Sequence, residues 1–391
     1  MRSLLLVPLA AALCFGCART ESAAEPPAES EQTVAPAARI DTPPSTDDLA
    51  SLATGAVVLT GGWQLFDENA RSGWTTRAGR GSQPAVVELA DRGIVRAIAV
   101  DVANVEHEGR IPRVLLVEMS DKSATSGFAP IASIALPRER KDGLTFAATR
   151  EVPGRWLRVS VKKTYSGNVA EVMEVRALGE RLTHEANAPL TGSYQTSRGA
   201  LQLTQNGNVV TGCEQRGALD GRLLTFLWRG KPAVATVSAS GRILGGSWSS
   251  PEKMEPFDGR RVSATPKPCR TAVASLADEL RAAGRAIVYG IHFDPESAAL
   301  REESKPVLAS IAEMLHAAPE LRITIEDHSD TTLHDAHVSH ARASAVMARL
   351  AGAGIDAARM QAAGMAATKP LASNDSPLGR AVNRRVELVR Q

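Results

Sequence analysis

The spacing of apolar residues changes near residue 271, and this change predicts a multidomain chain with two kinds of architecture. Before it, short apolar runs such as residues 114–119 and 223–228 stand between turn residues, and several alternate with polar residues as half-buried strands do. After it, the apolar residues of 307–315 lie on one helical face. Because 391 residues are too many for one ordinary core, we expect about two to four domains.

The part of the chain before residue 271 predicts two β domains. Residues 51–180 show strand-like runs and no long helical period, which is typical of a β-sandwich or jelly roll. Residues 188–265 repeat this style in smaller units, which indicates a small antiparallel β domain, either a barrel or a meander. Trp228 and Trp248 are expected in its core. The glycines at its expected turns are Gly207, Gly221, Gly230 and Gly241.

Residues 271–391 predict an α/β domain, because helical and strand patterns alternate there. Strands are expected over residues 286–293 and 321–325. A helix is expected over residues 338–350, with Gly352 after its end.

The first 17 residues have the pattern of a secretory signal peptide. Arg2 supplies a positive start, and the apolar run of residues 4–15 is shorter than the about 20 residues that span a bilayer. Residues 13–17 resemble the lipobox of bacterial lipoproteins, in which cleavage leaves the cysteine acylated. This resemblance implies lipidation at Cys17, and several acyl chains anchor a protein stably. The alternative is an ordinary signal peptide and a soluble periplasmic protein.

Residues 18–50 are rich in Ala, Glu, Pro, Ser and Thr, which predicts a disordered linker. Beyond the signal peptide only Cys213 and Cys269 remain. Because the periplasm is oxidising, two cysteines there favour a disulfide, with two buried free thiols as the alternative.

The C-terminal region carries a set of motifs in a specific order. Phe293-Asp294 ends an expected strand, His328-Ser329-Asp330 forms a loop, and residues 338–343 read Val-Ser-His-Ala-Arg-Ala. Residues 379–388 read Gly-Arg-Ala-Val-Asn-Arg-Arg-Val-Glu-Leu. Over residues 280–390 the chain resembles the OmpA-like peptidoglycan-binding domain.

This resemblance implies a site for diaminopimelate, a wall amino acid with an ammonium and a carboxylate on one carbon. Asp330 is expected to bind the ammonium and Arg342 the carboxylate, since guanidinium groups bind carboxylates through two parallel hydrogen bonds. By resemblance, Phe293, Asp294 and Ser329 line the same cleft. The alternative is that Asp330 and Arg342 form a structural ion pair on the surface.

The chain departs from the family pattern around Asp330. Asp327 stands where the family has a glycine, and the loop at residues 331–335 is shorter than usual. The shorter loop and the negative charge that Asp335 adds near the carboxylate end are expected to weaken binding. His337 and His340 share a helical face and offer a metal site, although surface histidines with a pH effect on wall binding are favoured.

Three arginines near the C-terminus, Arg380, Arg384 and Arg385, allow two interpretations. They contact wall carboxylates or glycan, or they form ion pairs inside the domain. Internal pairing is favoured, because the family repeats these arginines away from the peptide cleft.

The first β domain resembles the discoidin-like, galactose-binding-like jelly roll. Motifs that agree in order include Leu65-Phe66-Asp67, Arg155-Trp156-Leu157 and the strand around Glu174. In that family an Asp and a Glu at the places of Asp67 and Glu174 often hold structural calcium, and oxygen ligands suit this ion. Solvated carboxylates are the alternative. Candidates for stacking on sugar are Trp63, Trp74 and Tyr165, with Trp74 expected in the core.

These features predict a lipid-anchored protein on the periplasmic face of the outer membrane that binds peptidoglycan and tethers membrane to wall. Its β domains are expected to bind glycans or envelope proteins. A net charge of +2 with scattered Lys and Arg argues against a nucleic-acid partner. No catalytic motif is recognisable, so we expect no enzyme activity. A surface adhesin and a glycan-acting enzyme are the alternatives.

Overall fold

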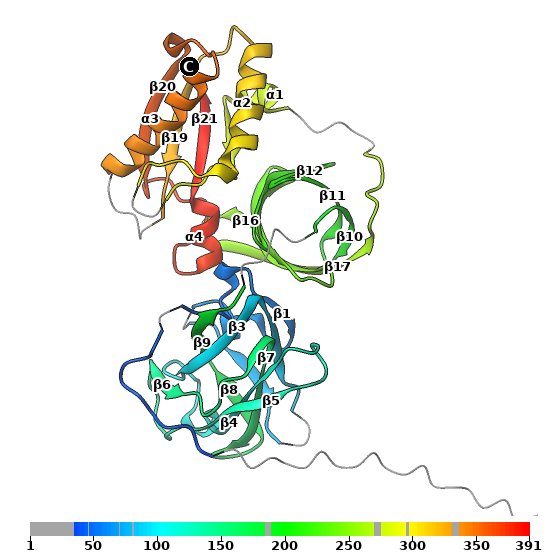
Figure 1. Ribbon diagram of the computed structural model, residues 1–391, viewed down its shortest axis with the longest axis vertical. Coiled ribbons are helices and arrows are strands. Elements are labelled where there is room, and N and C mark those ends of the chain that lie inside the picture. The colour runs from blue at the N-terminus through cyan, green and yellow to red at the C-terminus, as the bar shows by residue number, and fades with distance from the viewer. Residues whose placement is uncertain are drawn as a thin grey trace, which may run out of the picture. The chain divides into compact units, whose positions relative to one another are not determined.

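Three successive regions of the chain form separate strand systems in the computed structural model, which describes residues 35–45, 47–69, 71–79, 82–183, 189–269, 275–294, 297–330 and 336–391 (Figure 1). Among these residues the α-helices all lie after residue 271, and the regions before it are mostly strands. This confirms the predicted change in architecture: most of the described chain is β structure, and a smaller α/β part follows it. The signal peptide and Cys17 lie outside the described residues.

The N-terminal β domain is built around β3 (Ala85–Asp101), a long strand on which several others pair. Its sheet has the order β1-β3-β7-β4-β5, with β6 and β9 also on β3, and β2 and β8 form a separate antiparallel pair. Burial of Leu65, Phe66, Leu115 and Ile131 forms the apolar core. The other strands are β1 (Val57–Thr60), β2 (Trp74–Arg77), β4 (Pro112–Ser120), β5 (Ala129–Ala135), β6 (Leu144–Ala147), β7 (Pro153–Thr164), β8 (Val169–Val172) and β9 (Glu174–Arg181).

Part of the segment expected as a linker is folded. The backbone N–H groups of Ala37, Ile40 and Leu49 donate to carbonyls of this domain over 2.8–2.9 Å. Leu49 and Ala50 are buried in its core. A segment whose composition favours disorder is ordered here because its backbone groups find partners on the domain and two apolar side chains are buried.

The middle region is a closed barrel of eight antiparallel strands, each paired with its neighbours in the chain and with the last paired to the first. Tyr194, Phe226 and Phe257 are fully buried, and Trp228 packs with them as predicted. Trp248 is also buried, but outside this cluster of barrel residues. The four predicted turn glycines all have positive φ, a conformation that glycine adopts without strain. The strands are β10 (Gly192–Thr196), β11 (Gly199–Asn206), β12 (Val209–Gly212), β13 (Gln215–Asp220), β14 (Leu223–Trp228), β15 (Lys231–Val237), β16 (Arg242–Ser250) and β17 (Lys253–Ser263).

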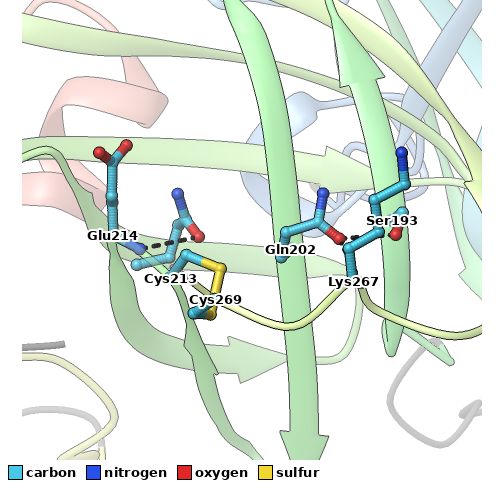
Figure 2. The surroundings of a disulfide bond; sticks show 7 residues. Ser193, Gln202, Cys213, Glu214, Lys267 and Cys269 are labelled. Carbon is cyan, nitrogen blue, oxygen red and sulfur yellow. Dashed lines mark hydrogen bonds between the residues drawn. A yellow bond between two sulfur atoms is a disulfide. The ribbon is translucent and has the colours of Figure 1, made fainter. Parts of the chain in front are cut away.

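The predicted disulfide is present and joins Cys213, directly after β12, to Cys269, beyond the last barrel strand (Figure 2). The segment after β17 is also held by Gln202, whose Oε1 accepts hydrogen bonds from Ser193 Oγ at 2.6 Å and from Lys267 N at 2.7 Å (Figure 2). Covalent and hydrogen-bonded contacts therefore fasten the start of the connection to the C-terminal domain onto the barrel wall.

The C-terminal domain is a four-stranded sheet of order β18-β21-β19-β20, with β19 and β20 parallel and the other pairs antiparallel. Ser275 and Asp278 form a capping box at the start of α1. The strand expected over residues 286–293 ends at Val288, and Phe293 forms only an isolated bridge with Leu300. The elements are α1 (Leu276–Ala283), β18 (Arg285–Val288), α2 (Lys305–Ala317), β19 (Ile323–His328), α3 (Ala336–Gly352), β20 (Met360–Ala366), α4 (Pro377–Asn383) and β21 (Arg385–Arg390).

Short 3-10 turns η1 (Leu52–Thr54), η2 (Trp63–Phe66), η3 (Glu108–Arg110), η4 (Glu302–Ser304) and η5 (Ala357–Arg359) complete the described elements. Within the described part of the chain, none of the helices combines the length and the apolar character that a membrane span needs.

Candidate functional site

The predicted wall-binding residues lie around the C-terminal end of β19. Ser329 and Asp330 follow that strand directly, and Arg342 lies on α3, which packs on β19 and β20. Ser339 joins these three elements, because its Oγ lies 2.7 Å from Asp327 O and accepts a hydrogen bond from Ala366 N at 3.1 Å. Gly364 is required at this junction, since a Cβ there would stand 2.3 Å from His340 N.

Arg342 is held by contacts from the segment around Phe293. Its Nε donates to Ser297 O at 2.8 Å and its Nη2 donates to Asp294 O at 3.4 Å. The guanidinium carbon lies 5.0 Å from the centre of the Phe293 ring, within the range of a cation–π contact. The plane of the guanidinium group is thus set before any ligand arrives, and both Phe293 and Asp294 contact Arg342.

Asp330 is completely buried and is ion-paired with Arg384, whose Nη1 lies 2.5 Å from its Oδ2. Arg384 was not among the predicted binding residues. The pairing of two strands would have identified Arg384 as a residue of this site. Strand β21 runs antiparallel to β19, and Arg385 pairs with His328. The residue before Arg385 therefore lies beside the end of β19, where Asp330 stands.

Asp327, which replaces the family glycine, lies below this site. Burial raises the pKa of its carboxyl to about 6, partly offset by the hydrogen bond from Ser339 and by Arg342 and Arg385. The shortened loop at residues 331–335 lies outside the described residues. The predicted weakening of ligand binding stays a prediction.

A buried network of charges continues from the site along the sheet. Arg385 Nε donates to Glu387 Oε1 at 2.7 Å, and both side chains are almost fully buried. Lys369 lies 3.5 Å from Glu326, and Arg285 lies 3.4 Å from both Glu326 and Glu387. The two carboxylates of this network therefore already have cationic partners.

His328 lies within the same network, with its Nε2 3.4 Å from Glu326 and 3.7 Å from Glu387. Burial, followed by the nearby arginines and lysine, lowers its pKa to about 3, so the imidazole is neutral at physiological pH. A neutral imidazole beside two carboxylates resembles a metal-ligand set. The surrounding cations already neutralise these carboxylates, which leaves little electrostatic need for a metal ion.

The three C-terminal arginines form different contacts. Arg380 pairs with Glu68 at 3.1 Å and donates to Asn374 O at 2.9 Å, and Arg385 pairs with Glu387. The Arg385 pair lies inside the domain, as the favoured interpretation has it, whereas the partner of Arg380 belongs to the N-terminal β domain. Arg384 is also paired, but with Asp330 at the candidate site. His337 and His340, the alternative metal pair, are exposed on α3.

A second candidate site lies in the N-terminal β domain, where Glu174 is buried with Asp48, Asp67 and Glu68 nearby. Neither carboxylate oxygen of Glu174 forms a well-defined hydrogen bond with a described residue. Burial first, and then repulsion from Asp67 and Asp48, raise its pKa to about 10. Burial likewise raises the pKa of Asp67 to about 7 and of Asp48 to about 6.

The second site combines carboxylate oxygens with an adjoining cavity. Asp67 is oriented by Ser72 Oγ, which donates to its Oδ2 at 2.8 Å, and by Asn69 N at 3.0 Å from its Oδ1. A cavity of about 260 Å³ is lined by Glu68, Asp101 and Glu174 and also by the cationic Arg176, and Asp67 does not line it. The structure thus brings the two predicted calcium ligands close enough for their charges to interact.

The predicted sugar-stacking residues differ in exposure. Trp74 is buried, as expected for a core residue, whereas Trp63 and Tyr165 are only partly buried. Tyr165 OH donates to Leu136 O at 2.6 Å. The guanidinium of Arg138 lies 6.0 Å from the centre of the Tyr165 ring. Next to it, a hollow of about 420 Å³ is lined by polar residues that include Arg138, Ser166 and Asn168.

Comparison with known proteins finds a family match in the C-terminal part. Residues 292–384 match the sequence model of the OmpA family. The chain is 30% identical over 129 residues to the probable lipoprotein YiaD of Escherichia coli, covering 29% of this chain and 59% of that protein. It is 34% identical over 115 residues to the peptidoglycan-binding protein ArfA of Mycobacterium bovis, covering 28% of this chain and 35% of ArfA.

Among solved structures, the peptidoglycan-associated lipoprotein from Burkholderia pseudomallei is 29% identical, with 26% of this chain and 88% of that chain covered and a TM-score of 0.24. The chain covers less than two thirds of the length of YiaD and ArfA. The family model and the two relatives support an OmpA-family domain over residues 292–384.

Proposed function

We propose that this protein, whose C-terminal part is an OmpA-family domain, binds peptidoglycan without a covalent bond and tethers the outer membrane to the cell wall through acyl chains on Cys17. The observation that carries the proposal is the preset guanidinium of Arg342 at the same end of β19 as the buried carboxylate of Asp330. The similarity to a peptidoglycan-binding protein supports the same ligand.

Diaminopimelate is the part of the wall peptide that such a pair would recognise. Arg342 would bind its carboxylate, because two of its nitrogens are already oriented by backbone carbonyls and its Nη1 donates to none of the described residues. Asp330 would bind the ammonium on the same carbon, where low solvent access strengthens the attraction. Phe293, Asp294 and Ser329 would shape the site around these two groups.

The test is a pull-down of the purified full chain with isolated peptidoglycan. Asp330→Ala and Arg342→Ala should each abolish co-sedimentation, because each removes one of the two charges that read the zwitterion. Arg349→Ala is the matched control, since Arg349 is exposed on the same helix and should leave binding unchanged. Wild-type sedimentation by both site variants would show that wall binding uses another surface.

The membrane anchor makes a separate prediction. Cys17→Ser should move the protein from the membrane fraction to the soluble periplasmic fraction while leaving its binding to isolated peptidoglycan intact. A variant that stays in the membrane would contradict lipidation at this residue. Under the proposal the protein is not an enzyme, so incubation with purified wall should release neither soluble sugar nor peptide.

We also propose that Asp67 and Glu174 hold calcium in the N-terminal β domain. The supporting observation is Glu174, a buried carboxylate whose two oxygens lack well-defined partners among the described residues. Without a cation, its raised pKa keeps a proton on the carboxyl at neutral pH. Calcium binds about six to eight oxygen ligands and would replace this proton. Calorimetric titration should detect calcium binding that Glu174→Gln removes and that magnesium does not reproduce.

The β domains would then present a carbohydrate- or protein-binding module. The hollow lined by Arg138, Ser166 and Asn168, close to the partly buried Tyr165, favours a glycan as its ligand. Calcium-dependent binding of the full chain to a glycan array, lost in Tyr165→Ala, would support this module and the surface-adhesin alternative. Absence of binding across a broad array would leave an envelope protein as the expected partner.

A further inference from the structure

The two halves of the proposed diaminopimelate site differ in their state. The carboxylate-binding half is ready, because backbone carbonyls and the Phe293 ring hold Arg342 while its Nη1 donates to none of the described residues. The ammonium-binding half is occupied, because Arg384 lies 2.5 Å from the Asp330 carboxylate. One half of the site accepts a ligand directly, and the other already contains a cation from the protein.

We propose that Arg384 is an internal counter-ion that the ligand's ammonium must displace from Asp330, so that Arg384 lowers the affinity of the site for its ligand. The inference rests on the proposed function, because it assigns Asp330 the ligand's ammonium. It goes beyond that function in assigning Arg384 the role of a competitor rather than a structural partner.

The burial of the two partners decides which of them can move. Asp330 has no exposed side-chain surface, whereas the Arg384 side chain is 45% exposed. The backbone of Arg384 is fixed, since its N–H donates to Arg380 O at 3.0 Å at the end of α4. The long side chain can therefore rotate into water without moving the main chain, and its guanidinium is well solvated there.

Displacement is favourable only when the incoming cation is held by a second contact. An ammonium that replaces Arg384 at Asp330 exchanges one charge-assisted hydrogen bond for another, so this step alone contributes little binding energy. A carboxylate on the same carbon adds the contact with Arg342, which among the described residues donates hydrogen bonds to backbone carbonyls and to no carboxylate. The internal counter-ion thus lowers the affinity for simple amines. Only a zwitterion gains the second contact that compensates for this loss.

The experiment measures the binding of free meso-diaminopimelate to the full chain by calorimetric titration. Arg384→Gln should lower the Kd about tenfold, the size expected when a charge-assisted hydrogen bond no longer has to be exchanged. Arg384→Lys keeps the charge but lacks the planar guanidinium group, so its Kd should lie between those of Arg384→Gln and the wild type. Arg322→Gln, at the opposite end of β19, is the matched control and should bind as the wild type does.

The outcomes separate this inference from the proposed function. An unchanged or higher Kd in Arg384→Gln, with binding lost in Asp330→Ala and Arg342→Ala, would overturn the competitor role and leave the proposed site standing. Wild-type affinity in Asp330→Ala and Arg342→Ala would instead contradict the proposed site itself.

A second measurement avoids substitution and covers the case in which Arg384→Gln does not fold. In wild-type protein with ¹⁵N-labelled arginine, the Nη1–H signal of Arg384, the group that contacts Asp330, should show slow exchange with water before ligand is added. Saturation with meso-diaminopimelate should make this exchange fast, because the guanidinium moves into solvent. A signal that stays protected at saturation would contradict displacement.

Discussion

Buried carboxylates occur in both the C-terminal domain and the N-terminal β domain, but they are neutralised in different ways. In the C-terminal domain Asp330 pairs with Arg384 and Glu387 pairs with Arg385. In the N-terminal β domain Glu174 has no ion pair with any described residue, and its neighbours Asp48 and Asp67 are also acidic. The C-terminal pairs contain their own counter-ions, whereas the cluster around Glu174 requires protons or an added cation. Elsewhere in the N-terminal β domain the buried Glu118 is paired with Arg158 over 2.7 Å.

The comparison shows that burial alone does not determine what a carboxylate does. With a cationic partner a buried carboxylate is charged and contributes to fixed structure or to recognition of a ligand. Without one, it has a raised pKa and is a candidate metal ligand. Removing the cation of a buried pair in the C-terminal domain should therefore lower stability, whereas removing the Glu174 carboxyl in the N-terminal β domain should raise it.

The largest expected effect is that of breaking an internal pair in the C-terminal domain. Arg385→Gln should lower the free energy of unfolding by about 3–5 kcal/mol, because Glu387 would stay buried without its nearest counter-ion. Hydrogen exchange at the amides of β19 and β21 would report the change. Arg390→Gln, an exposed position on β21, should change stability by less than about 0.5 kcal/mol. A loss of similar size in both variants would remove the contrast between buried and exposed charge.

Calcium should act on the N-terminal β domain and spare the C-terminal one. At a free concentration one hundred times its Kd, the ion should add about 2.7 kcal/mol to the stability of the domain that binds it. Hydrogen exchange should slow at β9, which begins at Glu174, and should be unchanged at β19. Protection that increases equally in both strands, or in neither, would contradict a calcium site confined to the first domain.

In calcium-free protein, Glu174→Gln should raise the stability of the N-terminal β domain by about 1–3 kcal/mol, because it removes a carboxyl that must bind a proton to be buried. The gain should disappear when the wild type is saturated with calcium. Glu108→Gln, at an exposed position, is the control, with a change of less than about 0.5 kcal/mol. Destabilisation by Glu174→Gln without calcium would mean that the carboxylate has a partner in the folded protein.

The smallest effect is the change of the free energy of unfolding with pH. It amounts to about 1.4 kcal/mol per pH unit for each proton by which the folded and unfolded states differ. Asp48, Asp67 and Glu174 all have raised pKa values of about 6, 7 and 10, so the calcium-free N-terminal domain should lose stability as pH rises from about 4 to 7. In the C-terminal domain the lowered pKa of His328 and the raised pKa of Asp327 act in opposite directions between about 4 and 6.

Hydrogen exchange at several pH values would measure both slopes. The N-terminal domain should show a clear decrease in stability with rising pH, and the C-terminal domain should be nearly flat over the range in which His328 and Asp327 cancel. Saturating calcium should abolish the decrease, since it replaces the retained protons. Parallel slopes in the two domains would contradict the difference in how their carboxylates are neutralised.

The sequence by itself determined the features that depend on local pattern. The change from alternating strands to helices near residue 271, the turn glycines of the barrel and the helix that carries Arg342 all follow from spacing along the chain. The pairing of Cys213 with Cys269 followed from their being the two cysteines left after the signal peptide. Each of these inferences needs only residue types and short-range periodicity.

Only the tertiary structure decided which charges are paired and which are not. Arg384 and Arg385 are adjacent in the chain, yet one pairs with Asp330, 54 residues away, and the other with Glu387, two residues away. The same holds for Ala37, Ile40 and Leu49, which lie in a segment whose composition predicts disorder but whose backbone N–H groups find partners on the N-terminal β domain. Ion pairs and orphaned carboxylates depend on distances across strands, and residue spacing along the chain does not contain those distances.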